Sequence, residues 1–142
     1  IATLKFTPKI DFIMSKRRVV ITGLGMLSPV GNSVSESWNN IINGKSGVSN
    51  ITKFETEGFD TKFAATVNFN PEDYLDKKEI RRVDEFIQFG LIASDECVND
   101  SGLNLEEEDL NKIGVSIGSG IGGLSTIEEN KLVLDKKGPK RI

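Results

Sequence analysis

Histidine is absent from the sequence, and cysteine occurs once, at Cys97. A single thiol cannot form an internal disulfide, and without histidine the chain offers neither a zinc finger nor a Cys/His catalytic pair. Asp95, Glu96 and Asp100 lie close to Cys97 in the sequence and oppose formation of a thiolate. We therefore predict that Cys97 is a small buried core residue. We also expect no catalytic residue and no metal site in this chain, and the sequence implies no cofactor.

Long apolar runs and a surplus of positive charge are also missing. No stretch approaches the roughly 20 apolar residues that a membrane helix needs, so we do not expect a membrane protein. The net charge of −3 gives no general reason to bind nucleic acid or anionic lipid, so a basic partner site must be local. With one cysteine, a reducing cytoplasm is the simplest compartment. The 142 residues predict one domain with one core.

The first residues of the chain do not resemble a natural N-terminus. Residues 1–13 lack a starting methionine and the apolar centre of a signal peptide, whereas Met14 to Arg18 is typical of a protein start. We expect residues 1–13 to be an upstream or non-native extension. Because the sequence stops at Gly138–Ile142 without a closing strand or tail, we expect residues 14–142 to be a domain truncated at its C-terminus.

Two glycine loops are the most informative features that are present. Residues 22–31 follow the β-branched run at 18–22, and residues 118–124 follow a second such run at 113–117. These runs predict buried strands. A strand, a glycine turn and a helix form the arrangement by which α/β enzymes bring backbone close to a ligand.

Helix signals lie after and between these loops. The capping box formed by Ser33 and Glu36, with Gly44 behind it, predicts a helix from about Val34 to Asn43. Asn70–Asp73 predicts a short helix start. The helix cap at Asp76 predicts a longer helix that Gly102 ends.

The remaining segments complete the predicted order of elements. Residues 48–70 are expected to be a connection packed by aromatic side chains, with a short strand at 63–67. The acids at 105–110 predict another helix start, and a capping box at Ser125 predicts a last helix that runs toward Asp135. The order β, α, short β, α, β, α indicates an α/β layered fold.

Two motifs leave alternatives open. Gly118, Gly120 and Gly123 match the G-x-G-x-x-G of dinucleotide-binding domains, although the acid expected about 20 residues later lies beyond the end of the sequence. Glycines that only permit tight turns and close packing are the simpler interpretation. A basic cluster at 77–82, in which residues 78, 81 and 82 share a helical face, is either a solvated surface or a docking site for an acidic partner.

Three stretches of the chain resemble, in the same order, the N-terminal portion of the β-ketoacyl-acyl carrier protein synthase II family of thiolase-like condensing enzymes. They are residues 17–32 with Trp38 and residues 44–47 behind them, residues 78–90, and residues 117–124. Several spaced motifs are more specific than one glycine pattern. The resemblance covers residues 14–142 and implies a thiolase-like layered α/β fold, present as its N-terminal half only, in a protein that forms a homodimer.

The resemblance also implies an activity in fatty-acid chain elongation. Members of the family take an acyl chain from its carrier protein onto a cysteine, decarboxylate malonyl-carrier protein with the help of two histidines, and join the two pieces. In the family those residues come from later segments, so we expect this chain to be inactive alone. A non-catalytic ketosynthase-like partner subunit is one alternative, and a dinucleotide-binding α/β domain is another.

Two sites are carried over by position from the resemblance. Lys78, Arg81 and Arg82 match the basic residues that meet the acidic acyl carrier protein in the family. Gly120 and Ile121 match the wall of the acyl pocket near the dimer interface. The resemblance therefore implies carrier-protein binding by the first group and substrate binding by the second.

Overall fold

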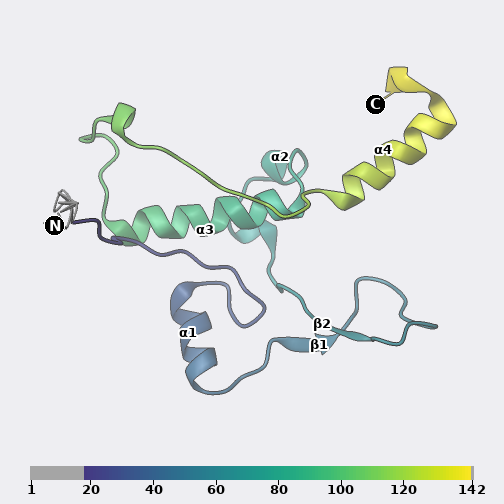
Figure 1. Ribbon diagram of the computed structural model, residues 1–142, viewed down its shortest axis with the longest axis horizontal. Helices are drawn as coiled ribbons and strands as arrows, with labels where there is room; N and C mark the ends of the chain where they lie inside the picture. The colour runs from purple at the N-terminus through teal and green to yellow at the C-terminus, as the bar shows by residue number, and fades with distance from the viewer. Residues whose placement is uncertain (1–17, 142) are drawn as a thin grey trace, which may run out of the picture.

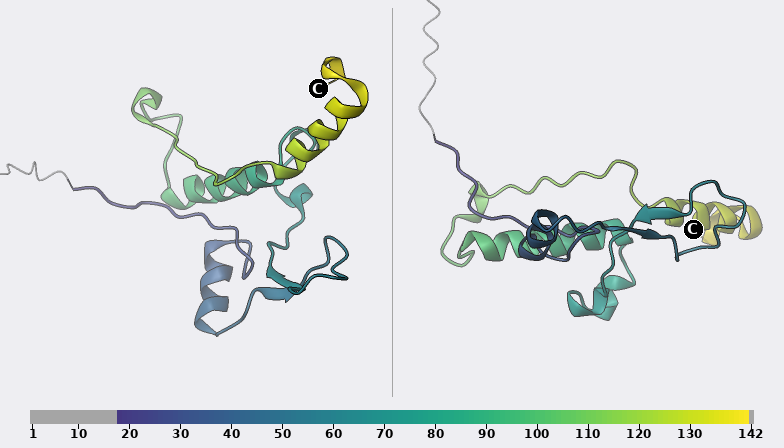
Figure 2. Two further views of the ribbon diagram at one scale, coloured as in Figure 1. Left: turned by 45° about the vertical axis from the view of Figure 1, so that its right-hand side comes forward. Right: turned by 90° about the horizontal axis from the view of Figure 1, so that it is seen from below.

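A computed structural model of the protein describes residues 18–141, so the predicted extension at 1–13 lies outside the described residues. Helix α3 (Glu85–Ser101) is its central element: residues 18–28 lie along one side of it and residues 113–121 along another (Figure 1). Helix α4 (Leu124–Lys137) projects away from α3 (Figure 2). The other elements are α1 (Val34–Ile42), β1 (Val48–Asn50), β2 (Phe63–Ala65), α2 (Lys77–Ile80) and the 3-10 turns η1 (Pro71–Asp73), η2 (Leu110–Lys112) and η3 (Pro139–Arg141).

Helix α1 confirms the predicted capping box and nearly the predicted bounds. The Ser33 hydroxyl accepts a hydrogen bond from the Glu36 amide at 3.1 Å. The Glu36 carboxylate accepts a hydrogen bond from the Asn32 amide at 2.7 Å, and so satisfies a backbone donor just before the helix. Gly44 follows the helix with φ of 67°, the left-handed conformation in which glycine ends helices.

The long helix predicted after Asp76 is divided in two. The Asp76 carboxylate caps α2 by accepting from the Lys78 and Glu79 amides, as predicted, but the chain turns at 81–84 before α3 begins. The buried Gln88 side chain stabilises this break, because its amide donates to the carbonyls of Ile80 at 3.4 Å and Val83 at 3.1 Å. Helix α3 ends at Gly102, as predicted, with φ of 67°.

The predictions of strands at 18–22 and 113–117 are wrong for the described residues. Both segments run without strand pairing, and the sheet consists of the antiparallel pair β1–β2, in which Ser49 faces Ala64. A strand exists through hydrogen bonds to a neighbour, and residues 18–141 place no such neighbour beside either segment. Their apolar side chains are exposed: Val19 by 90%, Ile21 by 82% and Val115 by 83%. The short strand predicted at 63–67 is confirmed as β2.

Two predicted helix starts are also corrected. The acids at 105–110 lie in turns that lead to η2, and hydrogen bonds from Asn111 lower the pKa of the exposed Asp109 carboxyl. Helix α4 begins at Leu124, one residue before the predicted cap, and its N-cap Gly123 has no side chain to bond the free amides. The short helix predicted at Asn70–Asp73 is present as η1.

Burial is concentrated around α3 and the start of α1. Within residues 18–141, Ile92 is the buried hydrophobic residue, and Ser37 and Gln88 are the buried polar ones. The Ser37 hydroxyl donates to the Gly31 carbonyl at 3.1 Å. Phe69 packs edge-to-face on Phe89 of α3 with ring centroids 5.3 Å apart, which confirms an aromatic contact in the predicted connection. Across the described residues, no helix combines the length and apolar character needed to cross a membrane.

Candidate functional site

The first glycine loop lies directly against the backbone of α3. An ideal Cβ on Gly25 would lie 1.7 Å from the Ala93 carbonyl oxygen, and one on Gly23 would lie 2.2 Å from the Cys97 carbonyl oxygen. Both distances are far shorter than any real Cβ contact, so side chains are excluded at these positions. The two glycines therefore allow close packing of the loop on the helix.

Acidic side chains of α3 hold this loop through its amides. Glu96 Oε2 accepts from the Met26 amide and Oε1 from the Val34 amide, both at 2.8 Å. Asp100 Oδ2 accepts from the Leu24 amide at 2.8 Å. One carboxylate thus connects the glycine loop with the first residue of α1, and charged acceptors make such bonds stronger than neutral ones.

Cys97 takes part in the same contact. It is half-buried on α3, and its thiol donates to the Gly23 carbonyl at 3.4 Å. Cys97 therefore packs against the first glycine loop, as a core residue would, but it is half-buried and not fully buried as predicted. From the sequence, Glu96 and Asp100 were expected only to oppose formation of the Cys97 thiolate, and their bonds to the loop amides were not predicted. The spacing of Glu96 and Asp100, four residues apart on one helix, was the available signal that they share a face.

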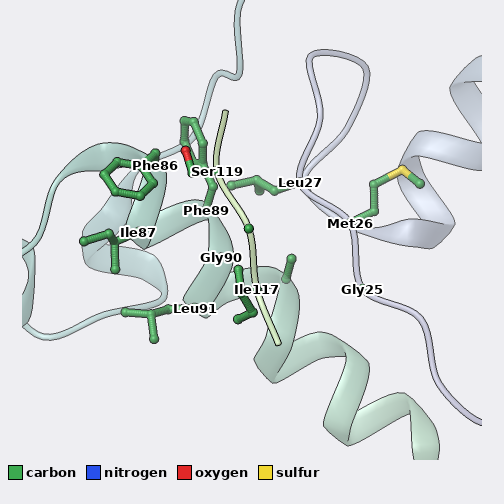
Figure 3. Close-up of a pocket in the computed structure, with 12 residues that line it drawn as sticks. Gly25, Met26, Leu27, Phe86, Ile87, Phe89, Gly90, Leu91, Ile117 and Ser119 are labelled. Carbon is green, nitrogen blue, oxygen red and sulfur yellow. The ribbon is translucent and has the colours of Figure 1, made fainter. Parts of the chain in front are cut away.

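A pocket of about 620 Å³ separates the two glycine loops. Figure 3 shows its lining side chains, which come from the first loop, the N-terminal half of α3 and residues 117–119. Large apolar side chains dominate the lining, including Phe86, Phe89 and Leu91, and no acid or basic residue contributes to it. Such a surface suits an apolar ligand and supplies no group for acid–base chemistry.

Gly120 and Ile121 lie beside this pocket but do not line it. They follow Ser119, whose hydroxyl accepts from the Gly122 amide at 3.1 Å and so forms a turn across them. The Ile121 side chain is 73% exposed. The two residues therefore present backbone and one branched apolar side chain on the surface between the pocket and α4.

The basic cluster is exposed but does not lie on one helical face. Lys78 belongs to α2, Arg81 is the C-cap residue that follows this helix, and Arg82 lies in the break before α3. Lys77 pairs with Glu72 at 3.3 Å, whereas the structure shows no ion pair for the other three within residues 18–141. The cluster thus leaves Lys78, Arg81 and Arg82 able to meet an external acidic group. In the same residues, no group of three potential metal ligands comes together.

Comparisons with known proteins agree in pointing to one family. A family model described as "Beta-ketoacyl synthase, N-terminal domain" matches residues 16–142. Over 130 residues the chain is 52% identical to a 3-oxoacyl-[acyl-carrier-protein] synthase 2 of Vibrio cholerae, which covers 91% of this chain and 31% of that protein. A protein of the same name from Coxiella burnetii is 48% identical over 130 residues, again 91% of this chain and 31% of that protein. The chain therefore spans about a third of the length of these curated relatives.

Solved structures give the same assignment of fold. A chain described as "The ishigamide ketosynthase/chain length factor" superposes with a TM-score of 0.65 and 28% identity, over 84% of this chain and 30% of that one. A type II ketosynthase complex with its acyl-carrier protein gives a TM-score of 0.64 at 24% identity, over 85% of this chain and 31% of that one, and supports the fold alone. The layered thiolase-like α/β assignment is confirmed by these neighbours, although the described strands are few.

Proposed function

The chain belongs to the β-ketoacyl synthase family, and from this premise we propose that it is the N-terminal part of a condensing enzyme that elongates fatty acids. The reaction joins an acyl group from acyl carrier protein to malonyl-carrier protein. The acyl group first moves from its carrier to an enzyme thiol, and the carrier thiol leaves. The malonyl carboxylate then leaves as CO₂, and the resulting carbanion attacks the carbonyl of the acyl-enzyme thioester and releases the enzyme thiol. The observation that carries the proposal is the 52% identity to a 3-oxoacyl-[acyl-carrier-protein] synthase 2 across 91% of the chain.

The proposal divides the work between this chain and later segments of a longer protein. Residues 14–142 would supply the first half of the fold, the carrier-protein site at Lys78, Arg81 and Arg82, and the acyl-pocket wall at Gly120 and Ile121. The thiol and imidazoles would come from later segments, since this chain has no histidine and its one thiol bonds the Gly23 carbonyl. We further propose that the protein is cytoplasmic and forms a homodimer. The exposed apolar side chains of 18–22 and α4 support an interface with another protein surface.

Family membership weakens the dinucleotide-binding interpretation of Gly118, Gly120 and Gly123. That interpretation also requires a paired strand before the loop, and residues 113–117 form none within the described chain. A non-catalytic partner subunit remains the second candidate function for the longer protein. One similar structure is described as a ketosynthase together with a chain length factor, which favours this candidate. The two candidates differ in whether the longer protein condenses substrates by itself.

A condensation assay tests the proposed function. Purified full-length protein is incubated with acyl carrier protein loaded with an acyl chain and with malonyl-carrier protein labelled in the free carboxylate. We expect release of labelled CO₂ with formation of a β-ketoacyl-carrier protein, and no turnover by the 142-residue chain. Inactivity of the full-length protein would favour the partner subunit. Turnover by this chain that survives Cys97→Ala would contradict the division of work proposed above.

Reversal of the basic cluster tests the proposed docking site. In the full-length enzyme, Arg81→Glu with Arg82→Glu should raise KM for acyl-carrier protein about tenfold, because each exposed charge pair is worth about 0.2–1 kcal/mol and reversal turns attraction into repulsion. The salt dependence of KM should flatten, since screening then has less attraction to remove. Steady-state kinetics between low and moderate salt measure both effects.

The matched control for this reversal is Lys136→Glu with Lys137→Glu on the last turn of α4, which changes the net charge equally. It should leave KM for acyl-carrier protein within about twofold. Turnover of both reversed enzymes with a small acyl thioester that lacks the carrier should stay near normal. Equal loss with carrier-bound and small substrates in the arginine variant would show that the cluster is structural.

A further inference from the structure

Asp84 precedes α3 but does not cap it with its side chain. Its backbone is extended, with φ of −64° and ψ of 157°, and its carbonyl accepts from the Ile87 and Gln88 amides. The Asp84 carboxylate makes no capping bond to α3 and instead accepts a hydrogen bond from the Thr126 hydroxyl of α4. The first residue before one helix is therefore bonded to the first turn of another.

The second glycine loop fits tightly against the same side chain. An ideal Cβ on Gly123 would lie 1.7 Å from Asp84 Oδ2, and one on Gly122 would lie 3.6 Å from the Phe86 ring. Gly122 also has φ of 84°, a conformation that other residues rarely adopt. Two consecutive glycines thus bring the backbone of residues 122–123 onto the start of α3.

The charge of Asp84 suits this position. Gly123 is the N-cap of α4 and offers no side chain to that helix, so a neighbouring carboxylate provides the negative charge that a helix N-terminus favours. Within residues 18–141, no basic side chain forms an ion pair with Asp84. Its contacts are therefore directed at the loop and at α4.

These contacts place Asp84 between the two sites proposed for the enzyme. Arg81 and Arg82 lie three and two residues before it in the sequence, between α2 and α3, and Ile121 lies two residues before Gly123 in the loop that Asp84 contacts. We propose that Asp84, with Thr126, is a positioning residue that fixes residues 118–123 on α3 and thereby sets the acyl chain length that the enzyme accepts. The inference rests on the proposed function, because it gives Ile121 a role in the acyl pocket.

Acyl-chain selectivity of the full-length enzyme tests this role. In Asp84→Ala and in Thr126→Val, kcat/KM for a long acyl chain should fall about fivefold relative to that for a short one, because only the long chain reaches Ile121. Thr126→Ser retains the hydroxyl and should keep the wild-type ratio. KM for the carrier protein should stay within about twofold in all three variants, unlike in the arginine reversal. An unchanged ratio, or equal loss for both chain lengths, would overturn the proposal.

Amide hydrogen exchange gives a measurement that does not need catalysis. Residues 119–124 of the full-length protein should exchange at least several-fold faster in Asp84→Ala and Thr126→Val, whereas residues 88–96 of α3 should keep their protection. If Asp84→Ala fails to fold, Thr126→Val carries the same test. If residues 119–124 exchange faster in these variants but the wild-type protein has no condensing activity, the positioning role of Asp84 is supported and the proposed function is refuted. Unchanged exchange at 119–124 would refute the positioning role whatever the activity.

Discussion

Replacing Gly25 with alanine is expected to lower the free energy of unfolding by about 3 kcal/mol, at the upper end of the cost of overpacking. The added Cβ would lie 1.7 Å from the Ala93 carbonyl oxygen and 2.8 Å from its carbonyl carbon. Both are backbone atoms of α3, so no flexible side chain can move aside. The loop cannot retreat freely either, because the next amide, that of Met26, is bonded to Glu96.

Urea unfolding of the full-length protein measures this effect, with Gly114→Ala as the matched control. An ideal Cβ on Gly114 meets no atom within 4 Å, and its φ lies outside the left-handed region. The control should change the free energy of unfolding by no more than about 0.5 kcal/mol. Equal effects of the two substitutions would show that the contact between the first glycine loop and α3 is absent from the folded protein.

Signals that act within four residues were predictable from the sequence. Ser33 and Asp76 cap their helices through side-chain oxygens that accept from amides two or three residues later. Gly44 and Gly102 follow their helices in the left-handed conformation that glycine adopts easily. These features depend on local chain geometry alone, so no knowledge of the rest of the fold was needed.

The strands and the helix break depended on partners that periodicity does not reveal. Residues 18–22 and 113–117 have the apolar content of buried strands, but pairing is decided by a neighbouring chain segment. The break before α3 arises because the Gln88 amide, folded back from the first turn, satisfies the carbonyls of Ile80 and Val83. Asp84, an N-cap residue type, was the signal that could have located it.

The candidate site was predictable in outline only. The sequence located both glycine loops, and the structure shows that they border one apolar pocket. The bonds that Met26 and Val34 donate to Glu96 join residues 70 and 62 positions apart, and the bond that Thr126 donates to Asp84 spans 42 positions. Such contacts follow from tertiary structure, so they could not be read from local spacing. The roles of Gly120 and Ile121 rest on family resemblance, because neither residue lines the pocket in the described chain.

Replacing Ile121 with phenylalanine in the full-length enzyme is expected to lower kcat/KM for long acyl chains about fiftyfold. A ring at this position would remove space for the end of the chain, and loss of about three buried methylenes costs roughly 2.4 kcal/mol. Short chains that end before Ile121 should keep nearly normal rates. Ile121 is 73% exposed in the described chain, so the larger side chain meets no packed neighbour within residues 18–141.

Competition between a long and a short acyl-carrier protein in one reaction measures this selectivity directly, because both substrates meet the same enzyme concentration. Ile127→Phe is the matched control, since it makes the same exchange at a 59% exposed position on α4. The control should leave the ratio of the two rates unchanged. Equal losses for long and short chains in Ile121→Phe would indicate general misfolding and remove Ile121 from the pocket. A ratio that falls only in Ile121→Phe would support a wall formed by the second glycine loop, and with it the proposed division of the enzyme between this chain and later segments.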